Sequence, residues 1–166
     1  MQYLIGVVPP AEIGARLRAE FRYGTEPHVT VKAQSGLTDE RINDLTSSIT
    51  LALEALGSFE VELGPRSTFG DRVAYISIQS PRIHDLHQLL LDLVNPAHQE
   101  RLRYHELGPY TPHLTIRRGK NLDFKDVAAR VAKLGALPPF IVDSVWLFKQ
   151  EANGQPYRRA AEFRLS

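Results

Sequence analysis

A five-residue pattern occurs twice in this chain and constrains its fold more than any other feature. Residues 27–31 read Pro-His-Val-Thr-Val, and residues 112–116 read Pro-His-Leu-Thr-Ile, 85 positions later. Each copy follows a predicted strand and helix, and each precedes a predicted helix and two further strands. One short motif can recur by chance, but recurrence within the same order of elements is typical of a duplicated unit. The sequence therefore predicts a single domain over residues 1–166, built as two lobes about a pseudo-twofold axis.

Hydrophobic periodicity defines those elements. Short apolar or alternating runs predict strands at residues 3–8, 28–32, 59–63, 72–79, 112–117, 140–149 and 157–165. Apolar residues at helical spacing predict helices at residues 11–22, 38–56, 81–94 and 122–134. Thr38 is a suitable N-cap for the second of these helices. The mixture of strands and helices in this order indicates an α+β fold.

Charge and composition narrow the possible functions. Twenty Lys and Arg against 19 Asp and Glu give a net charge of +1, which is too small for holding duplex nucleic acid by bulk phosphate neutralisation. A small or single-stranded anionic ligand is compatible with this charge. The absence of cysteine excludes disulfides, thiolate nucleophiles and Cys-ligated metals. No apolar run approaches the roughly 18 residues of a membrane span and no signal peptide is evident, so we expect a cytoplasmic protein without a membrane partner.

Strand alternation places the polar residues of each motif on one face. His28 and Thr30 project to one side of the first motif strand, while the neighbouring valines project to the other. His113 and Thr115 repeat this arrangement in the second copy. If a twofold axis relates the lobes, the two polar faces meet in one cleft.

Two imidazoles and two hydroxyls in one cleft suit acid–base chemistry at a phosphodiester. The unperturbed pKa of histidine is about 6.5, so one ring can be neutral while the other is protonated. The neutral ring activates water or a hydroxyl, the protonated ring protonates the leaving oxygen, and the threonine hydroxyls donate to non-bridging phosphate oxygens. This chemistry requires no metal or other cofactor. Because the motifs are nearly symmetric, the sequence does not assign which histidine is the acid and which the base.

The paired motifs resemble the two His-x-Thr-x signatures of the 2H phosphoesterase superfamily. Within it, the chain is most similar to the bacterial 2′-5′ RNA ligase-like proteins and RNA 2′,3′-cyclic phosphodiesterases. The sequence Gly-Pro-Arg-Ser-Thr-Phe at 64–69, followed by Arg-Val-Ala-Tyr-Ile at 72–76, resembles the segment between the motifs of this family. The resemblance spans nearly the whole chain. It implies a bilobal fold with antiparallel sheets and flanking helices around a central cleft.

The same resemblance implies an activity and a site. It implies metal-independent cleavage of cyclic or 2′-linked phosphodiesters, and we expect the substrate to be a 2′,3′-cyclic phosphate on an RNA end or a nucleotide. It assigns His28 and His113 as general acid and base, and Thr30 and Thr115 as phosphate-binding residues. With acid and base exchanging roles in the reverse direction, the site would also ligate 2′-5′ RNA ends. We expect a monomer that acts on RNA ends or cyclic nucleotides.

Residues next to the motifs are further candidates for the cleft. Lys32 and Arg117 each lie four residues after a motif histidine, so alternation predicts that both face the cleft and neutralise phosphate. A solvent-exposed strand end is an equally good interpretation, and a bulge would bring in Arg118 instead. Tyr110 either lines the cleft or packs, and packing is favoured. Residues 32–34 lack the aromatic side chain that many relatives have downstream of the first motif, so no base stacking is predicted there.

The remaining histidines give weaker signals. His84 and His87 share one face of a predicted helix, where we expect solvent rather than a metal ion. His98 and His105 lie in the polar stretch 95–111, which is a candidate substrate lid.

The C-terminal strands contain two more candidates. Trp146 lies in an apolar run and is expected in the core. Arg158 and Arg159 are expected at the surface, and contact with nucleic acid is the alternative for this pair.

Two other functions compete with the phosphodiesterase interpretation. A binding module on the same fold would recognise a terminal phosphate on RNA or a nucleotide without turning it over, and histidine variants would then change affinity alone. A two-histidine metal site would be inhibited by chelators, but neither motif supplies a carboxylate at ligand spacing. Turnover and its sensitivity to chelators therefore separate the three.

Overall fold

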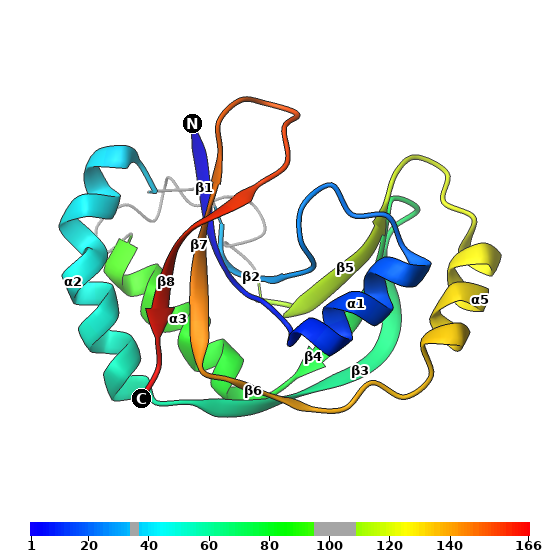
Figure 1. Ribbon diagram of the computed structural model, residues 1–166, viewed down its shortest axis with the longest axis horizontal. Coiled ribbons are helices and arrows are strands. Elements are labelled where there is room, and N and C mark those ends of the chain that lie inside the picture. The colour runs from blue at the N-terminus through cyan, green and yellow to red at the C-terminus, as the bar shows by residue number, and fades with distance from the viewer. Residues whose placement is uncertain (34–36, 95–108) are drawn as a thin grey trace.

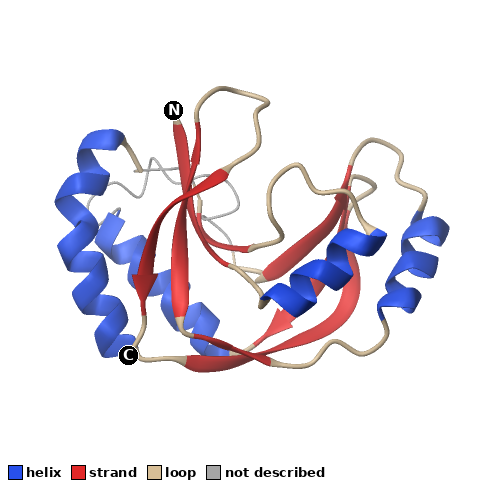
Figure 2. Ribbon diagram, viewed as in Figure 1, coloured by secondary structure: helices blue, strands red, loops and turns tan. Residues whose placement is uncertain are grey.

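The computed structural model describes residues 1–33, 37–94 and 109–166, which form an α+β fold with an antiparallel sheet (Figures 1 and 2). None of the described helices has the length and apolarity needed to cross a membrane. The helices are α1 (Ala11–Glu20), α2 (Asp39–Leu56), α3 (Pro81–Val94) and α5 (Phe124–Leu134). The strands are β1 (Gln2–Val7), β2 (Val29–Lys32), β3 (Phe59–Phe69), β4 (Val73–Gln79), β5 (His113–Arg118), β6 (Phe140–Val142), β7 (Ser144–Gln150) and β8 (Arg158–Arg164).

The strand order shows the duplication directly. The strands lie in the order β6-β3-β4-β5-β2-β1-β7-β8, so the two motif strands are neighbours at the centre. They pair through Val29 and Leu114, which are equivalent positions of the repeat. Equivalent residues that face each other in antiparallel strands lie across a twofold axis. The structure thus confirms the pseudo-twofold α+β fold that the repeated motif predicts.

Each half of the chain contributes a long strand to the opposite lobe. β3 follows the first motif strand, β2, in sequence but lies in the lobe of the second, where it pairs with β4. β7 follows the second motif strand, β5, but lies in the lobe of the first, where it pairs with β1. One lobe therefore contains β2, β1, β7 and β8, and the other contains β5, β4, β3 and β6. In Figure 1, α2 and α3 lie beside the first lobe, and α1 and α5 lie beside the second. This exchange of strands ties the two lobes together.

Two strands differ from their expected ranges because of how they pair. β3 continues to Phe69 instead of ending near residue 63, since residues 66–69 pair with β4 although their side chains are exposed. The strand expected over 140–149 is divided at Asp143, because β6 pairs with β3 whereas β7 pairs with β1. Neither partner can be inferred from alternation along one segment.

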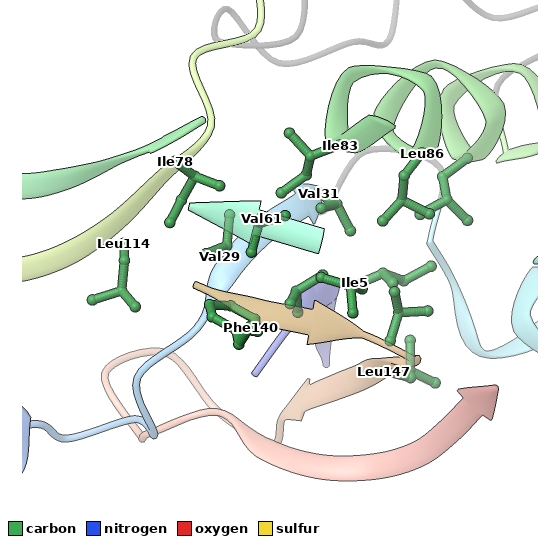
Figure 3. Packing of buried hydrophobic residues seen from close by; sticks show 14 of the residues in the cluster. Ile5, Val29, Val31, Val61, Ile78, Ile83, Leu86, Leu114, Phe140 and Leu147 are labelled. Atoms are coloured by element: carbon green, nitrogen blue, oxygen red, sulfur yellow. The ribbon is translucent and has the colours of Figure 1, made fainter. Parts of the chain in front are cut away.

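Apolar side chains anchor the two motif strands in the core. Val29 and Leu114 have no exposed surface, and Val31 and Ile116 are 1% and 2% exposed. Figure 3 shows Val29, Leu114 and Val31 packed among apolar side chains of β3, β4 and α3. Burial of apolar surface contributes about 25 cal/mol per Å², so this packing fixes where the motif strands lie. Their alternate side chains consequently face away from this core.

Candidate active site

Both motif strands line one pocket of about 800 Å³. Its walls also include the segment between α1 and β2 and the turn between β7 and β8. The polar motif residues in its lining are His28, Thr30, His113 and Thr115. The fold therefore brings together the four polar side chains that the repeat predicts for a common cleft.

The same hydrogen bond holds both histidines. Nδ1 of His28 lies 2.7 Å from the carbonyl oxygen of Glu26, and Nδ1 of His113 lies 2.7 Å from that of Thr111. Because a carbonyl oxygen can only accept, we assign the Nδ1 proton to both rings. Nε2 is then the nitrogen that gains or loses a proton. Both rings thus have the tautomer that acid–base chemistry at Nε2 requires.

A bulge after the first motif changes which residue faces the pocket. In β2 the pairing with β1 shifts between Thr30 and Lys32, so the extra residue interrupts the alternation. Lys32 is consequently fully buried, and its Nζ donates to the carbonyl of Ala33 at 3.0 Å. Ala33 lines the pocket in its place, contrary to the expectation that Lys32 faces the cleft.

The second motif strand has an equivalent bulge. In β5 the pairing with β4 shifts after Thr115, which lies opposite Tyr75. Arg118 lies opposite Val73, two residues along β4 and hence on the same strand face as Tyr75. Arg117 and Arg118 are both exposed and both line the pocket. The bulge therefore places Arg118 on the face of the motif side chains, while Arg117 remains at the pocket wall.

Tyr110 packs against β2 and does not line this pocket. Its hydroxyl donates to the carbonyl of Thr30 at 2.8 Å, and its ring stacks on His87 with centroids 4.0 Å apart. Nδ1 of His87 lies 2.7 Å from the carbonyl oxygen of Val31. His87 is 8% exposed, so the expectation that it faces solvent is wrong, whereas His84 is exposed. The stacked pair fixes two consecutive carbonyls at the bulge.

His98 and His105 lie outside the described residues, together with most of the candidate lid over 95–111. Among the residues that the structure describes, no three His, Cys, Asp or Glu side chains are grouped to hold a metal ion.

A buried aromatic ring packs beside His28. The centroid of Phe148 lies 5.0 Å from that of the imidazole, and Phe148 has no exposed surface. This approach depends on Gly6, where a Cβ would lie 3.1 Å from the carbonyl oxygen of Val29 and 3.4 Å from Cδ2 of His28. The side of this imidazole that meets Phe148 is therefore closed, while the ring also lines the pocket.

His113 has two aromatic neighbours on the hairpin of β3 and β4. Its ring centroid lies 4.9 Å from that of Phe69 and 5.2 Å from that of Tyr75. Sequence reasoning did not select either residue for the site, although both belong to segments that resemble the family. The proximity of Phe69 depends on the unexpected length of β3, whereas Tyr75 lies on β4, the strand next to β5.

Burial lowers the pKa of His28 below its ordinary value of 6.5. The positive charges of His113 and Arg118 lower it further, while the carbonyl and the carboxylate of Glu26 act in the opposite direction. The net shift is downward. His28 is therefore held in its neutral form at neutral pH.

Glu26 is held in place from outside this pocket by Arg159. Nε and Nη2 of the guanidinium each donate to one carboxylate oxygen at 2.5 Å. The same guanidinium lies 4.2 Å from the ring centre of Trp146, and all three residues line a second pocket of about 350 Å³. Trp146 is half-buried instead of lying in the core, and Arg158 and Arg159 are exposed as expected. The 133 positions between Glu26 and Arg159 explain why the sequence gives no sign of this pair.

Two lobes that meet along equivalent His-x-Thr strands, with both histidines lining one pocket, define the two-histidine class of phosphoesterase folds. Residues 9–154 match the family described as the 2′-5′ RNA ligase superfamily. The chain belongs to this family, within the 2H phosphoesterases. No curated protein matches its sequence.

Solved structures share this fold at low sequence identity. TT0787 of Thermus thermophilus has a TM-score of 0.76 and 18% identity, over 99% of this chain and 97% of that one. Apo LigT of E. coli has a TM-score of 0.71 and 17% identity, over 99% and 97% of the two chains. At such identities the similarity establishes the fold alone, so the chemistry has to be inferred from the residues of the site.

Proposed function

We propose that this protein is a metal-independent phosphodiesterase that opens 2′,3′-cyclic phosphates at an RNA end or on a nucleotide. The observation that carries the proposal is the matched pair of Nδ1 hydrogen bonds, which leaves two Nε2 atoms for proton transfer at one pocket. His28 and His113 transfer the protons, and Thr30 and Thr115 bind the phosphate. General acid–base cleavage of a phosphodiester uses a base, an acid and donors to the phosphate oxygens, and these four side chains can supply all three.

Hydrolysis moves one proton at each histidine. The neutral imidazole accepts a proton from water at Nε2 while the water oxygen attacks phosphorus. The imidazolium donates its Nε2 proton to a ribose oxygen as the bond from that oxygen to phosphorus breaks. The product is a ring-opened phosphate monoester, and proton exchange with solvent restores both histidines. With an RNA 5′-hydroxyl in place of water, the same transfers join two RNA ends through a 2′-5′ linkage.

Charge and hydrogen bonding favour an anionic phosphodiester in this pocket. The hydroxyls of Thr30 and Thr115 can donate to the non-bridging oxygens as negative charge develops on them. Arg117 and Arg118 add positive charge to the same wall. The lowered pKa of His28 supplies one neutral imidazole before the substrate binds.

Complexes of a structural relative support a nucleotide as the ligand. LigT of E. coli has been crystallised with 3′-AMP and with ATP, and those structures have TM-scores of 0.68 and 0.67 to this chain. Both ligands carry a phosphate on a nucleoside. A nucleotide or an RNA end is therefore the first substrate class to test.

The deciding experiment measures turnover of a short RNA with a 2′,3′-cyclic phosphate end and of the four 2′,3′-cyclic mononucleotides. The wild type is compared with His28→Ala and His113→Ala, each with and without EDTA. His84→Ala is the matched control, since His84 is an exposed histidine outside the pocket lining. Loss of a general acid or base costs about 10²- to 10⁴-fold, so both motif variants should lose at least 100-fold in kcat.

Each result has a defined meaning. EDTA-resistant turnover that both motif variants lose supports the two-histidine mechanism, and the 2′- or 3′-phosphate product identifies the leaving oxygen. Inhibition by EDTA would point to a metal site instead. Binding of these compounds without turnover would replace the phosphodiesterase by a module that binds phosphorylated RNA ends or nucleotides.

A further inference from the structure

Phe69 is an exposed aromatic side chain beside the proposed reaction centre. It stands at the end of β3 and is 40% exposed. A single exposed apolar residue is ordinary on a protein surface, so exposure alone carries no function. The contacts of the ring are what distinguish it.

The ring belongs to a packed cluster of three. Its centroid lies 4.3 Å from that of Tyr75 at an interplanar angle of 27°, and 4.9 Å from that of His113 at 82°. Tyr75 is 7% exposed and lies opposite Thr115 in the sheet. The exposed ring thus packs directly against His113 and against Tyr75, the strand partner of Thr115. Its orientation is set before any ligand arrives.

The equivalent place in the other lobe is already filled. Thr30 lies opposite Gly6, and the fully buried Phe148 packs over that glycine at 3.5 Å from the position of a Cβ. A ring with no exposed surface offers no face to a ligand. Ala33, which follows the bulge and lines the pocket, has no ring at all. Of these positions beside the two motifs, Phe69 provides the accessible aromatic surface.

We propose that Phe69 stacks on the nucleobase of the substrate whose phosphate lies between the two histidines. This proposal rests on the proposed function and specifies its substrate class: nucleoside 2′,3′-cyclic phosphates and RNA ends, in preference to cyclic phosphates of sugars that lack a base. Every base has a π-face, so stacking of this kind tolerates all four bases. A ring held by Tyr75 also loses little conformational freedom on binding, which favours affinity.

The test compares two substrates that differ only in the base. Adenosine 2′,3′-cyclic phosphate is compared with 1-O-methylribofuranose 2,3-cyclic phosphate, for the wild type, Phe69→Ala and Phe69→Trp. Leu51→Ala, at a residue of α2 that is 67% exposed, is the control for removing an exposed apolar side chain. Loss of one base–aromatic stack corresponds to about a 5- to 150-fold effect. Phe69→Ala should raise KM for the nucleotide by that factor and leave kcat/KM for the base-free sugar within about twofold, and Phe69→Trp should restore the wild-type KM.

The base-free substrate separates stacking from support of His113. Equal losses on both substrates, or no loss on either, would overturn the proposal while leaving the phosphodiesterase intact. If the wild type turns over neither compound, the proposed function fails. Calorimetric binding of 3′-AMP and of ribose 3-phosphate then tests stacking on Phe69 by itself. Phe69→Ala should weaken binding of 3′-AMP alone, and unchanged affinity for 3′-AMP would overturn the proposal.

Discussion

The two motif strands have the same backbone arrangement in very different surroundings. Both histidines donate Nδ1–H to the carbonyl two residues earlier, and both strands bulge after the threonine. Around His28, the neighbouring aromatic ring of Phe148 is wholly buried. Around His113, the neighbouring ring of Phe69 is 40% exposed. Duplication has kept the histidine and threonine of each motif, while the aromatic rings beside the two histidines differ in exposure.

Because their surroundings differ, the two histidines can serve two different requirements, one of protonation and one of ligand contact. The closed side depresses the pKa of His28 by burial and so sets a starting protonation state. The open side leaves an aromatic face accessible next to His113. A substrate with one phosphate and one base is asymmetric as well, and a site of this kind can bind it in a single orientation.

Substitution of the two threonines is expected to have the largest effect on activity, and it tests whether the two motifs are equivalent at the phosphate. If both hydroxyls stabilise the developing charge on the phosphate, Thr30→Val and Thr115→Val should each lower kcat by about 100-fold. Valine preserves the shape of the side chain and removes the hydroxyl. Steady-state kinetics on a 2′,3′-cyclic nucleotide measures both variants.

Thr46→Val is the matched control for these two variants. The Thr46 hydroxyl donates to the carbonyl of Ile42 on an exposed face of α2, so its loss should leave kcat unchanged. A loss below about threefold in one motif variant alone would show that phosphate contacts one strand only. The symmetry of the phosphate site would then be limited to the backbone.

How far the sequence could predict this site depends on the range of the signal. The pseudo-twofold fold and the common pocket of the two polar faces follow from a repeat whose copies are visible in the chain, whereas the direct pairing of the motif strands was not predicted. Lys32 was misplaced because one extra residue in β2 reverses the faces of all that follow, and no residue type marks a bulge with certainty. The motif residues escaped this error because they precede the bulge.

Contacts made by distant segments lay beyond the sequence altogether. Phe69 reaches His113 because the polar end of β3 pairs with β4, and that pairing is decided by the neighbouring strand. The ion pair of Glu26 with Arg159 joins segments 133 positions apart. Alternation and motif spacing are local signals, whereas these contacts are set by how the two halves exchange strands.

Substitution of Glu26 tests the difference between the two histidines without changing a motif residue. Its charge raises the pKa of His28, so Glu26→Gln should lower that pKa further, while the backbone carbonyl that holds Nδ1 remains. One limb of the pH profile of kcat/KM should therefore move to lower pH. Movement of the acid limb identifies His28 as the base, and movement of the alkaline limb identifies it as the acid.

Glu12→Gln controls for the loss of a carboxylate, because Glu12 is exposed on α1 and does not influence His28. The profile of this control should match that of the wild type. A Glu26→Gln profile that also matches the wild type, or that moves to higher pH, would show that the carboxylate does not tune this histidine.

The smallest expected effect is on stability, and it tests the closed side in the absence of any substrate. In the unfolded chain His28 titrates near its ordinary pKa of 6.5, and in the folded protein it titrates at lower pH. Between these two values the unfolded state binds more protons at His28, so the contribution of His28 to the free energy of unfolding is most favourable above about pH 6.5 and becomes less favourable as the pH decreases. His28→Gln removes this contribution, whereas His84→Gln removes an exposed histidine of α3.

Urea unfolding followed between pH 7 and 5 should show a shallower pH dependence in His28→Gln than in the wild type. Equal slopes in the two would mean that burial does not depress the pKa of this ring, and the contrast between a closed and an open histidine would then rest on the aromatic neighbours alone.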